Sequence, residues 1–181
     1  MSLSLKSLVI GGGGTGGGYD GDANSSTNNG YTGFVFYGDG THTVSNPQTL
    51  RGAVAQTIRN DGTLDYGKSY VSKDLANFDF VVDSKFFPKN VGDTYLLRLT
   101  FKAVSGTFDN ALTVRLKAPG VVQQNTESFV TNPGDESMFT FNYHVSCLQD
   151  FKNSGGTFEA IADYDATLWG VGLLIIPVSR L

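Results

Sequence analysis

Cysteine is nearly absent from this chain of 181 residues, because Cys147 is the only one. A single cysteine excludes both an intramolecular disulfide and a cysteine-rich metal site. Cys147 follows the strand-like run FTFNYHVS, and we interpret it as a small buried hydrophobic residue, with a reactive thiol as the alternative. His144 lies three positions earlier, so in a strand its side chain points to the opposite face. This argues against a Cys–His nucleophile pair.

Positive charge is also scarce. The chain has 13 Lys and Arg against 17 Asp and Glu, a net charge of −4, and its N-terminal arm contains only Lys6. Nucleic-acid binding needs a basic stripe that neutralises phosphates, so we expect no nucleic-acid partner.

Long apolar runs are missing as well. The longest, LWGVGLLIIPV at 168–178, is too short to span a membrane as a helix and is typical of a buried strand. The apolar run at 8–10 is far shorter than the hydrophobic region of a signal peptide. We therefore expect neither a membrane partner nor a secretory leader.

A glycine motif near the N-terminus lacks the helix that it would need. The stretch SLVIGGGGTGGG (7–18) satisfies the dinucleotide-binding pattern G-x-G-x-x-G through Gly11, Gly13 and Gly16. That motif holds a pyrophosphate at the N-terminus of a following helix. The next stretch, YDGDANSSTNNG, is polar and has no helical periodicity, so we expect no cofactor.

These glycines are better explained as a flexible tether, made of Gly11, Gly12, Gly13, Gly14, Gly16, Gly17 and Gly18. The residues before them resemble a strand whose apolar side chains are Leu3, Leu5, Leu8, Val9 and Ile10. A lone strand cannot pair with itself, so we predict that this arm binds a neighbouring protein by strand addition. A fully extended tether of about eight residues spans roughly 25–29 Å, enough to cross a subunit boundary.

Composition divides the chain into a glycine-rich arm and loop at 1–30, a bridging region at 31–66 and a β-rich body at 67–181. In the bridging region, TGFVFYGD predicts a short strand. The stretch NPQTLRGAVAQTIRNDG (46–62) places Leu50, Val54 and Ile58 at a spacing that fits either a helix or a strand. Periodicity leaves that choice open.

Strand patterns dominate the body. In TYLLRLTFKAVS (94–105) and ALTVRLKA (111–118), apolar residues alternate with Arg, Lys and Thr, as in strands with one buried face. Roughly seven or eight such strands are joined by short Gly, Pro and Asp turns, which excludes the crossover helices of parallel pairing. We therefore predict an all-β, antiparallel jelly-roll sandwich in which 46–62 is the one candidate helix.

Residues suited to catalysis or ligand binding are few. His42 lies in the polar loop GDGTHTVSN, where a structural role is favoured over a general base. Asp20, Asp22 and Asn24 match the first ligands of a calcium loop, but its glycine and closing glutamate are missing, so we expect no metal. Paired carboxylates for glycoside hydrolysis are an alternative, with acids near predicted turns at Asp135, Glu136, Glu159, Asp163 and Asp165.

The last third of the chain is HVSCLQDFKNSGGTFEAIADYDATLWGVGLLIIPVSRL. It contains a D-F-x-x-x-G-G turn, a short strand, an acidic turn and a closing apolar strand that ends near a basic residue. In this order of turns and strands, residues 95–181 resemble the C-terminal part of tumour-necrosis-factor-like jelly rolls of tailed-phage virions. Those proteins are head decoration (cement) proteins, head fibres or fibre tips. The resemblance implies a homotrimer at the capsid surface, with the arm on the major capsid protein or another virion protein.

We therefore expect a non-enzymatic structural virion protein, a trimeric decoration or cement protein anchored by its arm. Trimer contacts are expected on the closing strand at Trp169, Leu173 and Ile175, although burial in the subunit's own core explains these residues equally well. The second hypothesis is a receptor- or carbohydrate-binding fibre tip, with sugar stacked on Tyr19, Tyr31, Tyr37 or Tyr66. A glycosidase or lyase is the third.

Overall fold

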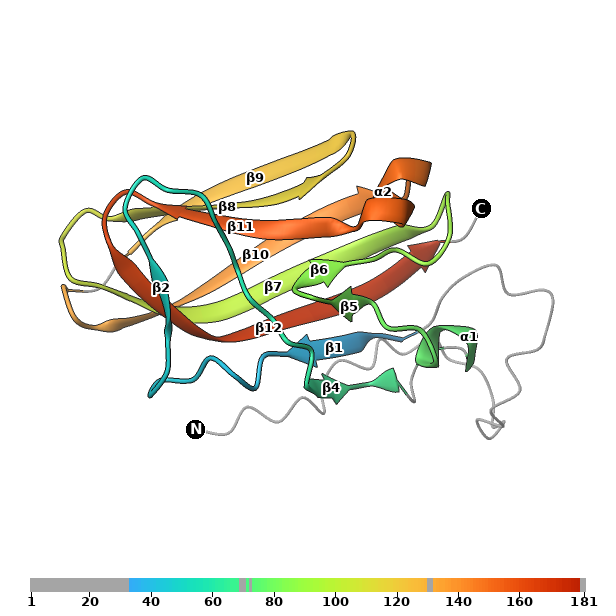
Figure 1. Cartoon of the computed structure of the whole chain (residues 1–181), viewed down its shortest axis with the longest axis horizontal. Helices are drawn as coiled ribbons and strands as arrows, with labels where there is room; N and C mark the ends of the chain where they lie inside the picture. The colour runs from blue at the N-terminus through green and yellow to red at the C-terminus, as the bar shows by residue number, and fades with distance from the viewer. Residues whose placement is uncertain (1–32, 69–70, 72, 130–131, 180–181) are drawn as a thin grey trace, which may run out of the picture.

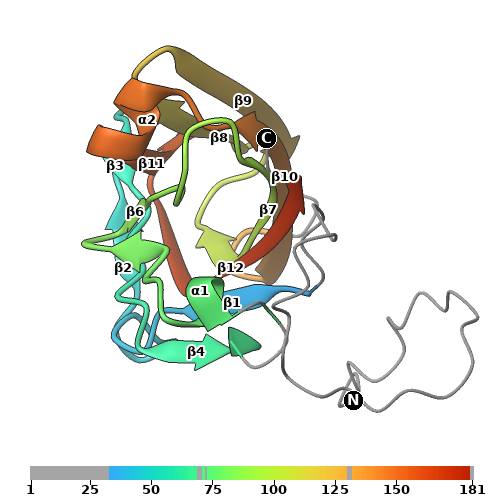
Figure 2. The same ribbon diagram turned by 90° about the vertical axis from the view of Figure 1, so that its right-hand side faces the viewer.

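The computed structural model describes residues 33–68, 71, 73–129 and 132–179. Their strands form two antiparallel sheets of six strands each, packed face to face (Figure 1). Figure 2 shows the two sheets on opposite sides of a shared interior. The two sheets are named below after their central strands, β12 and β11.

The β12 sheet contains, in spatial order, β10 (Glu136–Ser146), β7 (Thr94–Ser105), β12 (Ala166–Ser179), β1 (Val35–Gly38) and β4 (Leu64–Tyr66), and β2 (Gln48–Leu50) also pairs with β12. The β11 sheet contains β5 (Val81–Val82), β6 (Lys85–Phe86), β11 (Gly156–Ala162), β8 (Ala111–Ala118) and β9 (Val121–Ser128), and β3 (Gln56–Thr57) also pairs with β11. The chain changes sheets between β7 and β8, β9 and β10, β10 and β11, and β11 and β12. This repeated crossing is the topology of a jelly roll, so the predicted fold class is confirmed.

The long strands form where apolar and polar residues alternate. In β7, Leu97, Leu99 and Phe101 are buried, whereas Arg98 and Lys102 between them are exposed. The bounds of β7 and β8 coincide with the predicted 94–105 and 111–118. A register slip of one residue would turn the whole apolar set to solvent, so burial of one face fixes the pairing of these strands.

Aromatic rings fill much of the space between the sheets. The ring centroid of Phe101 lies 5.7 Å from that of Phe139 and 5.9 Å from that of Phe141, and these rings are nearly parallel. The ring of Phe129 meets that of Phe139 edge-on, with 4.9 Å between the centroids. Burial of such large side chains is the main favourable contribution to folding, and ring pairs add a smaller one. The high aromatic content noted in the sequence therefore serves the core.

The residues at 46–62 form no helix. They supply β2 and β3, which pair with strands of opposite sheets. Leu50 and Ile58 are both buried, whereas Val54 between them is exposed in a turn. The turn brings the chain close to the β11–β12 turn, and a Cβ at Gly52 would lie 2.9 Å from the Cα of Tyr164. The periodic spacing in this stretch thus reflects two short strands separated by a turn.

The bridging region at 31–66 contributes to the sandwich itself. From residue 33 onward it supplies β1 and β4 to the β12 sheet, and β2 and β3 to opposite sheets. The D-F-x-x-x-G-G segment forms α2 (Gln149–Ser154), in which Phe151 is fully buried. The only other helix in the described chain is α1 (Lys73–Ala76), and neither helix has the length or apolar character to cross a membrane.

Amide side chains join the two sheets where β9 and β10 face each other. The side-chain amide of Gln123 donates to the carbonyl of His144 (2.5 Å), and that of Asn125 donates to the carbonyl of Asn142 (3.4 Å). An edge strand with free carbonyls invites pairing with another chain. Here, β9 side chains occupy two of the β10 carbonyls.

Buried and exposed side chains alternate along β10, so truncating neighbouring residues should lower the free energy of unfolding by very different amounts. Phe139→Ala leaves a cavity among stacked rings and is expected to lower the free energy of unfolding by about 3–5 kcal/mol. Met138→Ala is the matched control, because Met138 is 70% exposed while Phe139 is 2% exposed, and we expect a change within about 0.5 kcal/mol. Urea denaturation of both variants measures this, and similar losses would contradict the inward orientation of Phe139.

Candidate functional site

Strand β1 ends in a turn with the sequence D-G-T. Asp39 is buried, and its carboxylate accepts hydrogen bonds from the backbone N–H groups of Thr41 (3.3 Å) and His42 (3.1 Å). Its own N–H donates to the carbonyl of Val171 in β12 (2.8 Å). An aspartate that accepts a bond from the residue two positions on forms an Asx turn. The turn is therefore built by Asp39 and anchored to the closing strand.

A second D-G-T turn lies just before β4. The Asp61 carboxylate accepts bonds from the backbone N–H of Thr63 (3.0 Å) and from the Thr63 hydroxyl (2.8 Å). Gly62 has φ of 68°, a conformation that glycine adopts without the cost of a Cβ. The same tripeptide thus forms the same kind of turn twice, at 39–41 and 61–63.

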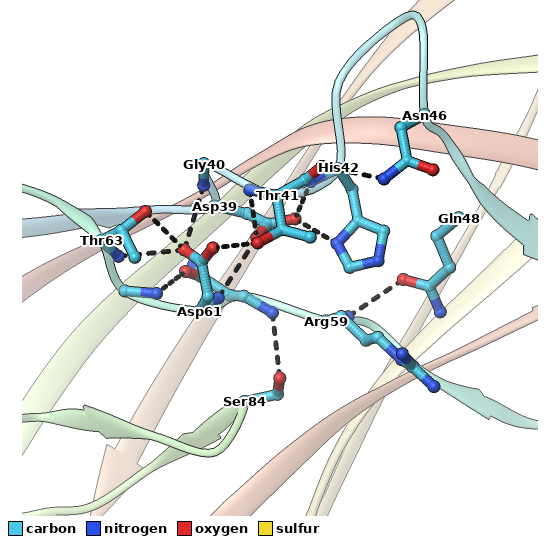
Figure 3. Close-up of polar contacts among 12 residues, drawn as sticks. Asp39, Gly40, Thr41, His42, Asn46, Gln48, Arg59, Asp61, Thr63 and Ser84 are labelled. Atoms are coloured by element: carbon cyan, nitrogen blue, oxygen red, sulfur yellow. Dashed lines mark hydrogen bonds and ion pairs between the residues drawn. The ribbon is translucent and has the colours of Figure 1, made fainter.

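The two turns bind each other reciprocally, an arrangement that we name the D-G-T clasp (39–41 and 61–63; Figure 3). The N–H of Asp61 donates to the Asp39 carboxylate (3.3 Å), and the N–H of Gly40 donates to the Asp61 carboxylate (3.0 Å). The Thr41 hydroxyl adds a bond of 2.6 Å to Asp61. A Cβ at Gly40 would collide with the Thr63 hydroxyl oxygen, so the close approach requires glycine.

The clasp determines the ionisation of Asp61. Burial acts to raise the pKa of this carboxyl, but the hydrogen bonds from Thr41, Thr63 and Gly40 outweigh burial and hold the pKa well below its ordinary value. Asp61 is therefore a carboxylate throughout the neutral range.

The clasp also orients His42. The Nδ1 atom of His42 lies 2.6 Å from the Asp39 carboxylate. A carboxylate can only accept, so this contact assigns the proton to Nδ1. Nε2 has no hydrogen-bond partner among the described residues and points away from Asp39 (Figure 3). The His42 carbonyl accepts a bond from Gly170 (3.1 Å), which ties this loop to β12.

Next to His42, a surface groove of about 480 Å³ runs between β2 and β3. It is lined by His42, Asn46, Pro47, Gln48, Thr49, Gln56, Thr57 and Arg59, and is called the β2–β3 groove below. The side-chain amide of Gln48 donates to the Thr57 carbonyl (2.6 Å) and accepts from the Arg59 N–H (3.0 Å). Since β2 and β3 belong to opposite sheets, Gln48 joins the two sheets as a peptide group would.

Two donors in the groove have no partner in the described structure. The Arg59 side chain is exposed and makes no hydrogen bond or ion pair with a described residue. The side-chain nitrogen of Gln56 is buried and also lacks a partner. The only hydroxyls of the lining are those of Thr49 and Thr57, and no carboxylate is among the lining residues. The groove is therefore suited to binding acceptors, and it has no acid pair for hydrolysis.

Sequence reasoning identified His42 but missed the other members of this site. The usable signal was the repetition of D-G-T, because an Asx turn is a local property of those residues. Gln48, Gln56 and Arg59 carry no such signal, since their convergence depends on the long-range pairing of β2 and β3 with different sheets.

Several predicted site residues lie outside the described residues: Leu3, Leu5, Leu8, Val9, Ile10, the tether glycines, Asp20, Asp22, Asn24, Tyr19 and Tyr31. Of the two other tyrosines proposed for sugar stacking, Tyr37 is buried in the core, so that role is wrong for it. Tyr66 is 61% exposed. Within the described ranges, no group of three or more His, Cys, Asp or Glu side chains is placed to hold a metal ion.

The acidic residues near turns have structural contacts. Glu159 pairs with Arg115 (2.6 Å), and Glu136 pairs with Lys102 (2.7 Å). The other three also accept hydrogen bonds: Asp163 from the backbone N–H of Ala111 and Asp165 from that of Gly52, both distant in the sequence, and Asp135 from the side-chain amide of Asn132. These contacts explain the acids without a hydrolytic role.

Cys147 is buried, which confirms its interpretation as a small hydrophobic residue. Burial raises the pKa of its thiol, and the nearby Asp93 carboxylate raises it further. His144 is exposed, on the other face of the strand. The two residues are therefore not arranged as a nucleophile and its base.

A phosphate-binding pattern also occurs at 62–69, where GTLDYGKS matches G-x-x-x-x-G-K-S/T. In a phosphate loop, these residues form a loop whose amides face the anion, followed by a helix. Here Leu64–Tyr66 is strand β4, paired with β1, and the ammonium of Lys68 lies 3.2 Å from Asp79. The next helix in the described chain, Lys73–Ala76, has only four residues, so residues 62–68 do not have the surroundings of a phosphate loop.

The closing strand presents a different set of residues from the predicted one. Leu173 and Ile175 belong to the core, and Trp169 is half-buried. The neighbouring Leu174 and Ile176 point outward instead. Together with Phe36, Tyr66 and Leu96 they form a cluster on the outer face of the β12 sheet, which we name the outer apolar strip.

Comparisons with known proteins identify no family for this chain. No family model and no curated protein matches the chain. Among solved structures, it is similar to Eiger TNF from S. frugiperda, with a TM-score of 0.48 and 8% identity, covering 84% of this chain and 95% of that chain. It is also similar to the PRD1 vertex protein P5, with a TM-score of 0.48 and 9% identity, covering 82% of this chain and 73% of that chain.

Because the pKa of Asp61 is lowered, we expect its contribution to the free energy of unfolding to depend on pH. Asp61→Asn removes the charge that Thr41, Thr63 and Gly40 stabilise, so we expect a loss of about 1 kcal/mol in unfolding free energy at pH 7. A carboxyl with a lowered native pKa stabilises the fold fully above its unfolded-state pKa, near 3.9, and loses that contribution as the pH falls toward the native value. The difference between wild type and variant should therefore shrink below about pH 4.

Urea denaturation at several pH values measures this difference. Asp109→Asn is the matched control, because Asp109 is exposed and has no hydrogen bond or ion pair to a described residue. A difference between wild type and Asp61→Asn that stayed constant down to pH 2 would contradict the role given to the clasp.

Proposed function

We propose that this chain is a non-enzymatic structural protein of a virus particle, which assembles as a homotrimer through the outer apolar strip and decorates or cements the capsid through its N-terminal arm. The proposal rests on the outer apolar strip. The β12 sheet packs one apolar face against the β11 sheet, and apolar side chains on its other face need a second partner to cover them.

The strip is continuous across four strands. Cross-strand register pairs Leu96 of β7 with Ile176 of β12, Leu174 of β12 with Phe36 of β1, and Phe36 with Tyr66 of β4. The rings of Phe36 and Tyr66 are 6.1 Å apart. Leu96 is 43% exposed, and Phe36, Leu174 and Ile176 are half-exposed. These five side chains therefore form one surface rather than scattered apolar positions.

Polar groups flank the strip on the β7–β10 side of the same sheet. The Arg98 guanidinium donates to the side chain of Asn142 (3.1 Å), and Lys102 pairs with Glu136. An apolar centre beside a polar rim is the usual composition of an interface between subunits. The strip lies on the face of the sheet and reaches its edge strand β4 at Tyr66, and its position on the face favours contact between sheet faces.

A further copy of this chain is the occupant that the proposal names. Each copy brings the same apolar surface, and closed cyclic symmetry buries that surface equally in every subunit. The number three comes from the resemblance of residues 95–181 to trimeric virion jelly rolls. Partners beyond the trimer, the major capsid protein or another virion protein, are assigned to the arm residues Leu3–Ile10.

The second candidate, a receptor- or carbohydrate-binding fibre tip, is favoured by one observation, the β2–β3 groove with its unpartnered donors. Both functions are compatible in one trimer, because the groove and the strip share no residue.

A charge placed in the strip should prevent assembly. Ile176→Glu, alone or with Leu96→Glu, buries an unpaired carboxylate in the proposed interface, so we expect the trimer to dissociate into folded monomers. Val122→Glu is the matched control, because Val122 is 66% exposed on β9 of the other sheet. Light scattering after size exclusion gives the mass, and circular dichroism confirms the fold. A monomeric wild type, or trimeric strip variants, would overturn the proposal.

Removal of the arm should abolish attachment to the virus particle without preventing assembly of the trimer. A chain that lacks residues 2–18 is expected to remain a folded trimer but to lose cosedimentation with virus particles. A second variant with Leu3, Leu5 and Leu8 changed to Ser keeps the glycine tether and should show the same loss, because the apolar side chains are the proposed contact. Unchanged particle binding by both variants would exclude the arm as the anchor.

A further inference from the structure

We infer that the β2–β3 groove is a binding site for an acidic saccharide, with Arg59 holding the carboxylate and Gln56 and His42 bonding sugar oxygens. This inference is independent of the proposed capsid role, because it uses different residues.

The charge of the groove favours an anion. The Arg59 guanidinium is exposed and unpartnered in the described structure, and no carboxylate is among the lining residues. Asp39, the acid that contacts His42, has a fully buried side chain that already accepts from Thr41, Asp61 and His42. Arginine matches a planar carboxylate through two parallel hydrogen bonds. Arg59 is therefore the contact for the acid group.

The remaining polar groups favour a ligand that carries oxygen atoms. The side-chain nitrogen of Gln56 is buried without a partner, and a buried donor that is left unpaired costs free energy. Because Gln56 lines the groove, rotation of its side chain would turn this nitrogen toward a hydroxyl, ring or carboxylate oxygen of a ligand there. Nε2 of His42 is also available, and it can bond a hydroxyl group whether or not the ring is protonated.

Size and composition select the class of ligand. The groove has a volume of about 480 Å³, within the range of sites for small ligands. No aromatic residue other than the His42 imidazole is among the lining residues, so the site offers no phenyl or indole platform for a neutral sugar. Recognition must come from charge and hydrogen bonds, which suits a sugar with a carboxylate.

The groove is held in place by the parts of the fold that surround it. The D-G-T clasp positions His42, and Gln48 fixes the spacing of β2 and β3 by bonding to Thr57 and Arg59. The side-chain amide of Asn46 donates to the Thr41 carbonyl (3.2 Å), which closes the loop on the clasp. A site on such supports loses little conformational entropy when a ligand binds.

The test uses the full chain and two acidic probes, 3′-sialyllactose and methyl glucuronide, with lactose and sodium acetate as the neutral sugar and the sugar-free acid. Titration calorimetry and ligand-observed NMR should detect one or both acidic sugars with Kd of about 1 mM or tighter, and neither control compound at that level. Failure of both acidic sugars to bind would overturn the inference, and so would equal binding of lactose or acetate.

Variants then assign the binding to this groove. Arg59→Gln should weaken the acidic sugar by at least about tenfold, and Gln56→Met, which keeps the shape but removes the donor, should weaken it several-fold. Arg51→Gln is the matched control, because Arg51 is exposed and is not a lining residue. Unchanged affinity in Arg59→Gln would overturn the assignment. Neither groove variant should alter the oligomer mass, and Ile176→Glu should leave sugar binding intact. The experiments therefore test the trimer interface and the sugar site separately.

Discussion

The reciprocal hydrogen bonds between the two D-G-T turns fix the corner of the sandwich on which the groove depends. Asp39 and Asp61 each accept bonds from their own turn and from the opposite one. Two neighbouring carboxyl groups are held side by side here because backbone N–H groups donate to both of them. The clasp holds β1 and β4 in register and directs His42 toward the groove. Loss of either aspartate would therefore disturb a sheet edge and a binding surface together.

Strand β12 connects the two surfaces that were assigned functions. Its first half pairs with β2, where Leu168 lies opposite Gln48, and its second half carries Leu174 and Ile176 of the outer apolar strip. Between the halves the pairing with β7 shifts register at 169–172, and Gly170 has φ of 62°. Such a bulge changes the direction of a strand. One strand can thus support a groove at the side of the sandwich and an apolar surface on its face.

The sequence predicts those parts of this fold that depend on local pattern. Strands β7 and β8 were predicted with their observed bounds because each buries one face along its whole length. The stretch at 46–62 could not be resolved, since Leu50 and Ile58 are buried against different sheets and their spacing has no local cause. The same limit applies to the site: the D-G-T turns are visible in the sequence, but their mutual binding and the approach of Gln56 and Arg59 to His42 are long-range.

Amide side chains restrict how this sandwich can associate. Gln123 and Asn125 occupy carbonyls of β10, and on the other side of the sandwich Gln48 bonds to the backbone at Thr57 and Arg59. At both places, side chains of the same subunit occupy some of the backbone groups that an added strand would use. This disfavours strand addition at these two places, and the proposed contact between copies uses the sheet face where the outer apolar strip lies.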